Sequence, residues 1–240
     1  MKVVAVIQAR MGSTRLPGKV LKDLCGDTVL ARTVSRARRA VLLTDIVIAT
    51  TTTLADDAIV LESQRLGCNV FRGSEQDVLD RYYCAAQESK ADVVVRITSD
   101  CPLIDPEVSD RTIRAFLNGD ADYASNVLDR TYPRGLDTEV MSFSALEIAW
   151  RDAREPFQRE HVTPFLHQNP QRFKLLSVTG DEDYSHHRWT LDVPEDLKFL
   201  RAVYSRRVDA NDLSWRDVLG ILEREPQLVS INRNIKQKAM

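Results

Sequence analysis

The 240-residue sequence is sparing in cysteine and histidine, with four of each. No two cysteines have the CxxC spacing, which argues against a zinc knuckle and against a thioredoxin-like redox motif. The histidines do not have the i, i+4 spacing of a helical zinc pair, so we predict no zinc site. The scattered cysteines also argue against a disulfide framework, and they indicate a reducing, cytoplasmic environment.

Long apolar runs and a surplus of one charge are missing too. The first apolar run stops at Ile7 with no cleavage site after it, so we expect no signal peptide. No later run approaches the length of a membrane span. The counts of 33 Lys and Arg and 35 Asp and Glu give a formal net charge of −2. We therefore expect no general electrostatic attraction to nucleic acid or to an anionic membrane.

The first half of the chain alternates short β-branched runs with helical periods, which predicts a doubly wound, mostly parallel α/β sheet. Such a sheet binds ligands beyond the carboxyl ends of its strands. The predicted strands are residues 3–7, 45–50, 69–71 and 92–98, and the predicted helices are residues 29–40, 54–66, 75–88 and 105–118. Arginines 32, 36, 38 and 39 are expected on the outer face of the first helix. Asp105 is the expected N-cap of the fourth helix, and Pro106 its first residue.

The second half of the chain is less regular. Its predicted strands are residues 121–126, 138–143, 173–178 and 188–191, and its predicted helices are residues 144–151, 155–168, 194–206 and 215–223. We find no linker, internal repeat or low-complexity segment. The sequence therefore predicts a single domain over residues 1–240 with a small irregular lobe.

The segment after the first strand, residues 8–19 (QARMGSTRLPGK), carries three cations and no acid. Its glycines free the backbone to approach a ligand, and its hydroxyl groups add hydrogen-bond donors. Three cations on such a turn, at the carboxyl end of a buried strand, suit a polyphosphate. The cations are Arg10, Arg15 and Lys19. The alternative interpretation is a basic surface loop with a proline turn.

Two familiar phosphate-binding motifs do not account for this loop. A Walker A loop has four residues between its glycines and a Ser or Thr after its Lys. Here five residues separate Gly12 from Gly18, and Val20 follows Lys19. The GxGxxG motif of dinucleotide-binding proteins is also absent from the chain.

The stretch QARMGSTRLPGKVL closely resembles the signature loop of sugar nucleotidyltransferases, and more narrowly that of cytidylyltransferases that activate sugar acids. Other stretches agree in the family's order: FRGSEQDVLDRYY (71–83), VVRITSDCPLIDP (94–106), YPRGLDTEV (132–140), REHVTPF (159–165) and RWTLDVPEDL (188–197). The resemblance spans nearly the whole chain and is closest to the spore-coat polysaccharide branch. It implies a nucleotide-diphospho-sugar transferase-like fold. It also implies that CTP and a sugar acid give a CMP-sugar and pyrophosphate, for surface polysaccharide or glycan synthesis.

Two aspartates are candidate ligands of a magnesium ion. Asp100 and Asp192 each follow a predicted strand, and strand ends share one rim of a parallel sheet. Two carboxylates, completed by phosphate oxygens and water, suit Mg²⁺. Alternatively, Asp100 starts a turn and Asp192 lies near a helix N-terminus. The resemblance implies the metal role, with one departure: Ser99 stands where the family usually has glycine.

The resemblance also assigns roles to further residues. It implies catalytic roles for Arg10, Arg15 and Lys19, nucleotide binding by Gln8, Ala9, Gly12, Ser13, Gly73, Ser74 and Arg81, and substrate binding by Arg134, Asp137, Arg159 and His161. An arginine in the last set would grip a substrate carboxylate through two parallel hydrogen bonds. Residues 130–185 become a candidate lobe for acceptor binding and dimerisation, because homodimers are common in the family.

Each of these assignments has a plainer alternative. Ser74 is also the expected N-cap of an ordinary helix, and the substrate-binding set also fits a solvated loop and a helix face. Arg96 stands in an otherwise apolar strand, so we expect a carboxylate or a ligand beside it.

Two other functions remain open. The triplets at 120–122 and 181–183 match the loose DxD pattern of glycosyltransferases, which would use a preformed nucleotide sugar. Such a transferase would have no need of a cationic loop for a departing triphosphate tail. The chain would alternatively be a nucleotide-binding protein without catalysis, for which Ser99 is the hint. The choice of cytosine as the base rests on the resemblance alone.

Overall fold

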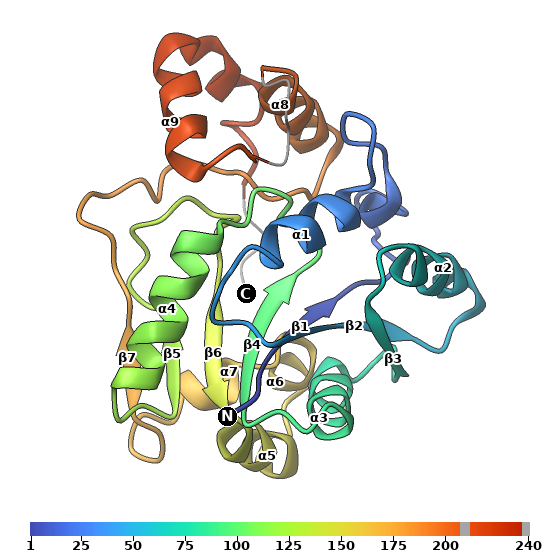
Figure 1. The fold of residues 1–240 in the computed structure, drawn as a ribbon, viewed down its shortest axis with the longest axis vertical. Coiled ribbons are helices and arrows are strands. Elements are labelled where there is room, and N and C mark those ends of the chain that lie inside the picture. Colours follow the sequence, from blue (N-terminus) through green and yellow to red (C-terminus); the bar gives the residue numbers. More distant parts are fainter. Residues whose placement is uncertain (207–211, 237–240) are drawn as a thin grey trace.

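The computed structural model describes residues 1–206 and 212–236, which build a seven-stranded sheet. The strand order is β3-β2-β1-β4-β6-β5-β7 (Figure 1). The strands are β1 (Val3–Gln8), β2 (Asp45–Thr51), β3 (Asn69–Gly73), β4 (Val93–Thr98), β5 (Tyr123–Ser125), β6 (Glu139–Ser142) and β7 (Leu175–Ser177). Strands β3, β2, β1 and β4 run parallel, whereas β6 is antiparallel to both β4 and β5. The predicted mostly parallel α/β sheet is therefore confirmed.

Helices cover both faces of the sheet (Figure 1). They are α1 (Val29–Ala37), α2 (Asp57–Arg65), α3 (Val78–Glu88), α4 (Pro106–Asn118), α5 (Phe143–Asp152), α6 (Pro156–His161), α7 (Pro164–His167), α8 (Pro194–Tyr204) and α9 (Trp215–Arg224). The described residues also form short 3-10 turns: η1 (Lys19–Leu21), η2 (Leu54–Asp56) and η4 (Pro226–Ile231). No helix among the described residues is long and apolar enough to cross a membrane.

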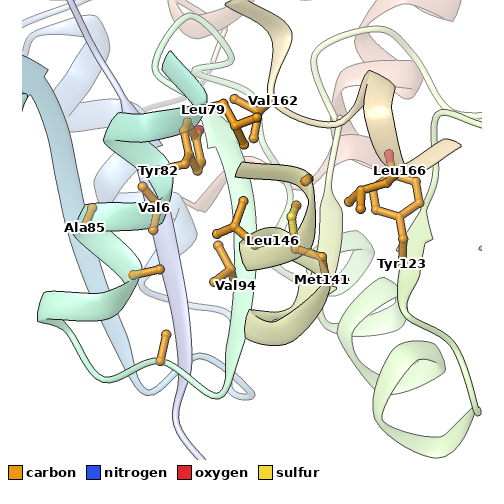
Figure 2. Close-up of a cluster of buried hydrophobic side chains, with 14 of the residues drawn as sticks. Val6, Leu79, Tyr82, Ala85, Val94, Tyr123, Met141, Leu146, Val162 and Leu166 are labelled. Atoms are coloured by element: carbon orange, nitrogen blue, oxygen red, sulfur yellow. The ribbon is translucent and has the colours of Figure 1, made fainter. Parts of the chain in front are cut away.

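Strand β1 is buried on both sides, as its run of β-branched residues predicts. Its even-numbered valines pack with α3, α5 and α7, in the cluster that Figure 2 shows around Val6, Tyr82 and Leu146. Its odd-numbered residues, such as Ile7, pack with α1, α2 and α4 on the other face. A third cluster joins α8, α9 and η4 to Trp189.

The parallel register brings the first loop and the candidate metal ligand Asp100 to one rim. Gln8, the last residue of β1, pairs with Ala49 of β2 and with Thr98 of β4. The backbone N–H of Ser99 donates to the Gln8 carbonyl at 3.2 Å. The segments that follow β1, β2 and β4 therefore start side by side, as carboxyl ends of parallel strands must.

Three predicted elements differ from the structure. Residues 155–168 form two helices, α6 and α7, which are separated at Val162, a buried β-branched residue with φ of 73°. Residues 188–191 are not a strand, since they form only an isolated bridge between Arg134 and Arg188. The helix expected from residue 75 starts at Val78, and its N-cap is Asp77 rather than Ser74. The Asp105 cap of α4 and Pro106 after it are confirmed.

The prediction that the arginines of α1 lie on an outer face is wrong for two of them. Arg32 and Arg36 are 7% and 0% exposed. The Arg32 side chain donates to the Leu24 carbonyl at 3.1 Å and lies over the Tyr204 ring of α8. The Arg36 Nε atom donates to the Ile104 carbonyl at 2.7 Å, and burial lowers the pKa of this guanidinium. The helix is covered here because Tyr204 of α8 packs on Arg32, and the segment that leads into α4 packs on Arg36.

Candidate active site

The loop after β1 is closed on the backbone of Met11. The Met11 carbonyl accepts from the N–H groups of Ser13 at 2.9 Å and Gly18 at 3.1 Å. Gly18 has φ of 64°, a left-handed conformation that glycine adopts at little cost. The chain then enters η1 with Lys19 as its first residue. The sequence thus forms a compact turn that projects Arg15 and Lys19 from a fixed base.

A buried carboxylate that sequence reasoning missed holds this turn. Asp56, which is 1% exposed, accepts the Met11 N–H at 2.8 Å. It also accepts the hydroxyl groups of Thr50 at 3.0 Å and Thr51 at 2.6 Å, and the Thr51 N–H at 3.1 Å. The run of threonines before Asp56 is the sequence signal for such a network. Asp56 therefore ties the cationic loop to the end of β2.

The loop cations meet the two candidate metal ligands. The Lys19 Nζ atom lies 2.7 Å from Asp100 Oδ2, 2.9 Å from Asp192 Oδ1 and 2.7 Å from the Leu191 carbonyl. The Arg15 Nη2 atom lies 2.8 Å from the same oxygen of Asp192. The structure therefore brings Arg15, Lys19, Asp100 and Asp192 together.

The charges of this cluster support one another. Burial by itself would lower the pKa of Lys19, but Asp100 and Asp192 outweigh it and raise that pKa. Burial by itself would raise the pKa of Asp192, but Lys19, Arg188 and Arg15 lower it. At neutral pH the ammonium group is therefore protonated and the Asp192 carboxylate ionised.

Asp192 reaches the rim by a route that differs from the predicted strand. The Leu191 N–H donates to the Asp100 carbonyl at 2.8 Å. The Thr190 hydroxyl donates to the same carbonyl at 3.3 Å. These two hydrogen bonds hold the segment before Asp192 beside Asp100, just after the end of β4. The carboxylates of Asp100 and Asp192 therefore come together without a strand at 188–191.

The donor set suits a hard divalent cation. Two carboxylates converge on one point, and Mg²⁺ in proteins takes one or two carboxylates with phosphate oxygens and water. Among residues 1–206 and 212–236 no group of three or more His, Cys, Asp or Glu side chains has the arrangement of a metal site. A metal ion here would therefore share its coordination with the nucleotide. Ser99 has a negative φ, so its replacement of glycine strains no backbone.

The predicted nucleotide-binding residues fall into two groups. Those of the first loop lie at or just after the end of β1: Gln8 is partly exposed, Ala9 is buried and its N–H donates to the Ala49 carbonyl at 3.1 Å, and Gly12 is exposed. Arg10 is exposed and forms no ion pair within the described chain. It is thus available to an incoming anion.

The second group, Gly73, Ser74 and Arg81, is tied together. The Arg81 Nη1 atom donates to the Ser74 carbonyl at 2.8 Å. A Cβ atom on Gly73 would lie 2.8 Å from the Phe71 ring and 3.3 Å from Arg81 Cγ. Arg81 is 1% exposed, and burial lowers its pKa. Arg81 therefore stabilises the turn at Ser74 through a hydrogen bond from its buried side chain.

On the predicted acceptor side, Asp137 has a partner that sequence reasoning missed. Arg130 holds both of its oxygens, at 2.6 and 2.8 Å. Burial by itself would raise the pKa of Asp137, but Arg130 and the Gly135 N–H lower it. The spacing of seven residues within one loop gave no signal for this pair.

Arg134 lies in the same loop and forms no ion pair with any described residue. Burial, Arg130 and Arg188 lower its pKa. Its backbone is bonded to residues 187 and 189 of the segment that carries Asp192. Gly135 permits this approach, because it has φ of 113° and its Cβ position would lie 2.7 Å from the Trp189 carbonyl carbon. Arg134 is therefore an unpaired, half-buried cation beside that segment.

Arg159 and His161 lie on α6. The Arg159 guanidinium binds Asp77 through Nε at 2.9 Å and Nη2 at 2.5 Å, and Nη1 donates to the Trp150 carbonyl at 2.5 Å. It lines a surface pocket of about 500 Å³ with Asp80, Trp150, Arg151, Ala153 and Arg154. His161 packs against the Phe157 ring at 4.8 Å between centroids. The hydrogen-bond donors of the Arg159 guanidinium are therefore already bound to protein acceptors, which the sequence did not predict.

Arg96 has the carboxylate partner that its buried position predicts. It forms an ion pair with Glu139 on the neighbouring strand β6. The Tyr123 hydroxyl donates to the other oxygen of Glu139 at 2.5 Å. This pair compensates a charge that would otherwise be costly to bury.

A turn of fixed cations that faces two carboxylates at the carboxyl edge of a parallel sheet is a site built for a nucleoside polyphosphate and a metal. Residues 4–216 match the family model described as cytidylyltransferase. The chain therefore belongs to the cytidylyltransferase family, and the resemblance of its motifs is confirmed.

Similar proteins agree with this assignment. The spore coat polysaccharide biosynthesis protein SpsF of Bacillus subtilis is 34% identical over 93% of this chain and 95% of its own. The 3-deoxy-manno-octulosonate cytidylyltransferase of Desulfosudis oleivorans is 30% identical over 80% of this chain and 77% of its own. A solved structure of a cytidylyltransferase from Leptospira borgpetersenii has a TM-score of 0.92 and 34% identity over 100% of both chains.

Proposed function

We propose that this cytidylyltransferase transfers CMP from CTP to a hydroxyl group of a sugar acid and releases pyrophosphate. The CMP-sugar would serve surface polysaccharide or glycan synthesis. The observation that carries the proposal is the contact of Lys19 with both Asp100 and Asp192, at 2.7 and 2.9 Å. The names of the relatives from B. subtilis and D. oleivorans support the sugar-acid substrate.

The loop cations bind and stabilise the triphosphate. Arg10 and Arg15 are exposed at the mouth of the site, and Lys19 lies deeper, beside the carboxylates. When the acceptor hydroxyl attacks the α-phosphorus in line, negative charge grows on the equatorial oxygens and on the departing pyrophosphate. Positioned cations stabilise that charge more than they stabilise the bound substrate, and so they lower the barrier.

Asp100 and Asp192 would hold Mg²⁺ between them and the nucleotide. The ion would supply Lewis-acid polarisation of the α-phosphate and would neutralise charge there. Lys19 contacts the same two carboxylates. Lys19 and the ion therefore share one pair of anionic partners, and the arrival of phosphate oxygens gives the ammonium group a second set of acceptors.

Arg134 is the residue we assign to the carboxylate of the acceptor. It is half-buried and lacks an ion pair among the described side chains, and its partly desolvated guanidinium suits a bidentate carboxylate. Asp137, fixed by Arg130, faces the same region and would accept from acceptor hydroxyl groups. Arg159 already binds Asp77, so its part would be to fix the start of α3.

A screen for pyrophosphate release tests the proposal. The four common nucleoside triphosphates are each mixed with a panel of sugar acids and Mg²⁺, and pyrophosphate is measured by an enzyme-coupled assay. We expect release only with CTP and one or a few sugar acids, and none without Mg²⁺. Equal release with all four triphosphates would contradict the base preference, and no release with any acceptor would contradict sugar-acid activation.

The glycosyltransferase alternative is not favoured. In the triplet 120–122, Asp120 pairs with Lys174 and Asp122 accepts the Lys174 N–H at 2.8 Å. In the triplet 181–183, Asp181 lies at the surface, 3.7 Å from Arg111. Neither triplet joins the cationic loop. Nucleotide-sugar turnover without pyrophosphate would still favour this alternative, and tight CTP binding without turnover would favour a protein that has lost catalysis.

We further propose that the protein works as a cytoplasmic homodimer, with residues 130–185 as the acceptor-binding and dimerisation lobe. The family resemblance supports the homodimer. The absence of paired cysteines supports the cytoplasmic location, because a reducing compartment keeps thiols free. All four cysteines are free thiols. Light scattering on the purified chain tests the assembly, and a monomer at micromolar concentration would contradict it.

A further inference from the structure

The two carboxylate oxygens of Asp192 have separate partners. Oδ1 accepts from Lys19 and Arg15, which belong to the loop after β1. Oδ2 accepts from Arg188 Nη2 at 3.0 Å. Contacts at both oxygens fix the rotation of the carboxylate, so the direction in which Asp192 presents its lone pairs depends on Arg188.

Arg188 is in turn held by a second aspartate. Asp196 is fully buried, and its two oxygens accept from Arg188 Nε at 2.9 Å and Nη2 at 2.8 Å. Oδ2 of Asp196 also accepts the backbone N–H groups of Asp192 at 2.9 Å and Val193 at 3.1 Å. Asp196 therefore orients Asp192 twice, once through its main chain and once through Arg188.

Asn232 completes this network from the C-terminal segment. Its Nδ2 atom donates to Asp196 Oδ1 at 2.9 Å and to the Arg188 carbonyl at 3.0 Å. Its side chain is buried, and the residue is 4% exposed. The turn η4 just before it packs against α8 and α9. Asn232 also lies beyond residue 216, where the match to the family model ends.

We propose that Asn232 is a positioning residue, which holds the Asp196–Arg188 pair so that Asp192 faces the metal and the nucleotide. The C-terminal segment then completes the active site without touching substrate. The inference rests on the proposed function, because it takes Asp192 as a metal ligand. Residues that orient a metal ligand typically change metal affinity by about 10- to 100-fold when they are replaced.

Asn232→Ala and Asn234→Ala form a matched pair for the test. Asn234 is exposed in the same segment and serves as the control. Binding of Mn²⁺, as a spectroscopic substitute for Mg²⁺, is measured by electron paramagnetic resonance with and without CTP. Hydrogen exchange is measured for the peptide that spans residues 188–196. We expect about tenfold weaker Mn²⁺ binding and faster exchange in Asn232→Ala, and neither change in Asn234→Ala.

The outcomes separate this inference from the proposed function. Wild-type Mn²⁺ affinity in Asn232→Ala, unchanged exchange at 188–196, or equal losses in Asn234→Ala each overturns the positioning role. If Asn232→Ala does not fold, Asn232→Ser keeps one donor, and the same two readouts apply to it. Failure of the wild-type protein to bind Mn²⁺ overturns the metal role of Asp192 instead. Exchange at 188–196 then decides by itself whether Asn232 holds this segment.

Discussion

Lys19 connects the cationic loop to both candidate metal ligands, Asp100 and Asp192. It is the one lysine that contacts both candidate metal ligands in the described chain, through a single nitrogen atom. An ammonium group in that place can pass from carboxylates to phosphate oxygens without leaving the site. Its loss would remove a positioned charge from the transition state while the backbone of η1 stays in place.

We therefore expect Lys19→Ala to lower turnover by at least about 10²-fold, as the loss of one positioned donor does. The measurement is pyrophosphate release from CTP at saturating Mg²⁺ and acceptor, with circular dichroism to check the fold. Lys22→Ala is the control, because Lys22 follows η1 directly and has no ion pair within the described chain. Turnover within a few-fold of the wild type in Lys19→Ala would remove Lys19 from the mechanism.

His187 gives the protein a pH dependence that is separate from the carboxylates. Burial first, and His186 second, lower the pKa of His187 from 6.5 to about 4. The unfolded chain therefore binds a proton between these values that the folded protein does not. Unfolding becomes easier as the pH falls from 6.5 towards 4, because the unfolded chain takes up a proton that the half-buried imidazole of the folded protein does not.

His187→Gln should flatten this part of the stability profile. The free energy of unfolding, measured with urea at pH 6.5 and at pH 4.5, should fall less in the variant than in the wild type. His186→Gln is the control: His186 is exposed and is the smaller cause of the low pKa of His187, so most of the fall should remain. Parallel profiles for wild type and His187→Gln would show that another group carries the dependence.

At the scale of elements, the active site depends on how one turn is joined to the next strand. The cationic loop is long and polar, and its own hydrogen bonds, on Met11, Ser13 and Leu16, stay within the loop. Asp56, from η2, supplies the link to β2 through the Met11 N–H. A loop that is fixed before CTP arrives loses less conformational entropy on binding, so we expect Asp56 to contribute to CTP affinity without touching the nucleotide.

Asp56→Asn should weaken CTP binding and lower stability together. An amide cannot accept all four hydrogen bonds that the carboxylate accepts, so a buried donor is left unpaired at a cost of about 1–3 kcal/mol. Calorimetric titration with CTP and thermal unfolding measure the two effects. Asp57→Asn is a matched control, because Asp57 is exposed and binds only Arg72 at 2.7 Å in the described chain. Unchanged CTP affinity in Asp56→Asn would show that the loop needs no anchor.

At the scale of the whole molecule, the site joins three distant parts of the chain. Arg15 and Lys19 come from the loop after β1, Asp100 follows β4, and Asp192 precedes α8. The cluster around Trp189 packs α8, α9 and η4 against the rest. A ligand that contacts all three parts binds the folded protein and not the unfolded chain, so it must raise the midpoint of global unfolding.

CTP with Mg²⁺ should therefore raise the unfolding temperature more than CTP alone. At a concentration 100 times its dissociation constant, a ligand stabilises the folded state by about 2.7 kcal/mol. In Asp192→Asn the extra increment from Mg²⁺ should disappear, while part of the CTP effect remains through the loop cations. Differential scanning calorimetry measures the increments. A full Mg²⁺ increment in Asp192→Asn would contradict its role as a ligand.

The sequence by itself determined the sheet, most of the helices, and the pairing of the cationic loop with Asp100 and Asp192. The elements are readable because strand and helix periods are local, and the place of Asp100 is readable because parallel strands end at a common edge. Asp192 was assigned to that edge from a predicted strand that does not form, and the resemblance of the motifs implied the same place. The sequence also identified the family, because the motifs stand along this chain in the order in which the family has them.

Only the tertiary structure decided which polar groups hold the site in place. Asp56 bonds to Met11, Arg130 to Asp137, and Asn232 to Asp196. It also reversed the prediction for Arg36, which lies buried against Ile104 and Asp105 at the start of α4. Such contacts join residues through the fold rather than through spacing along the chain. A buried polar side chain is satisfied by whichever partner the packing brings within about 3 Å, and no local pattern encodes that partner.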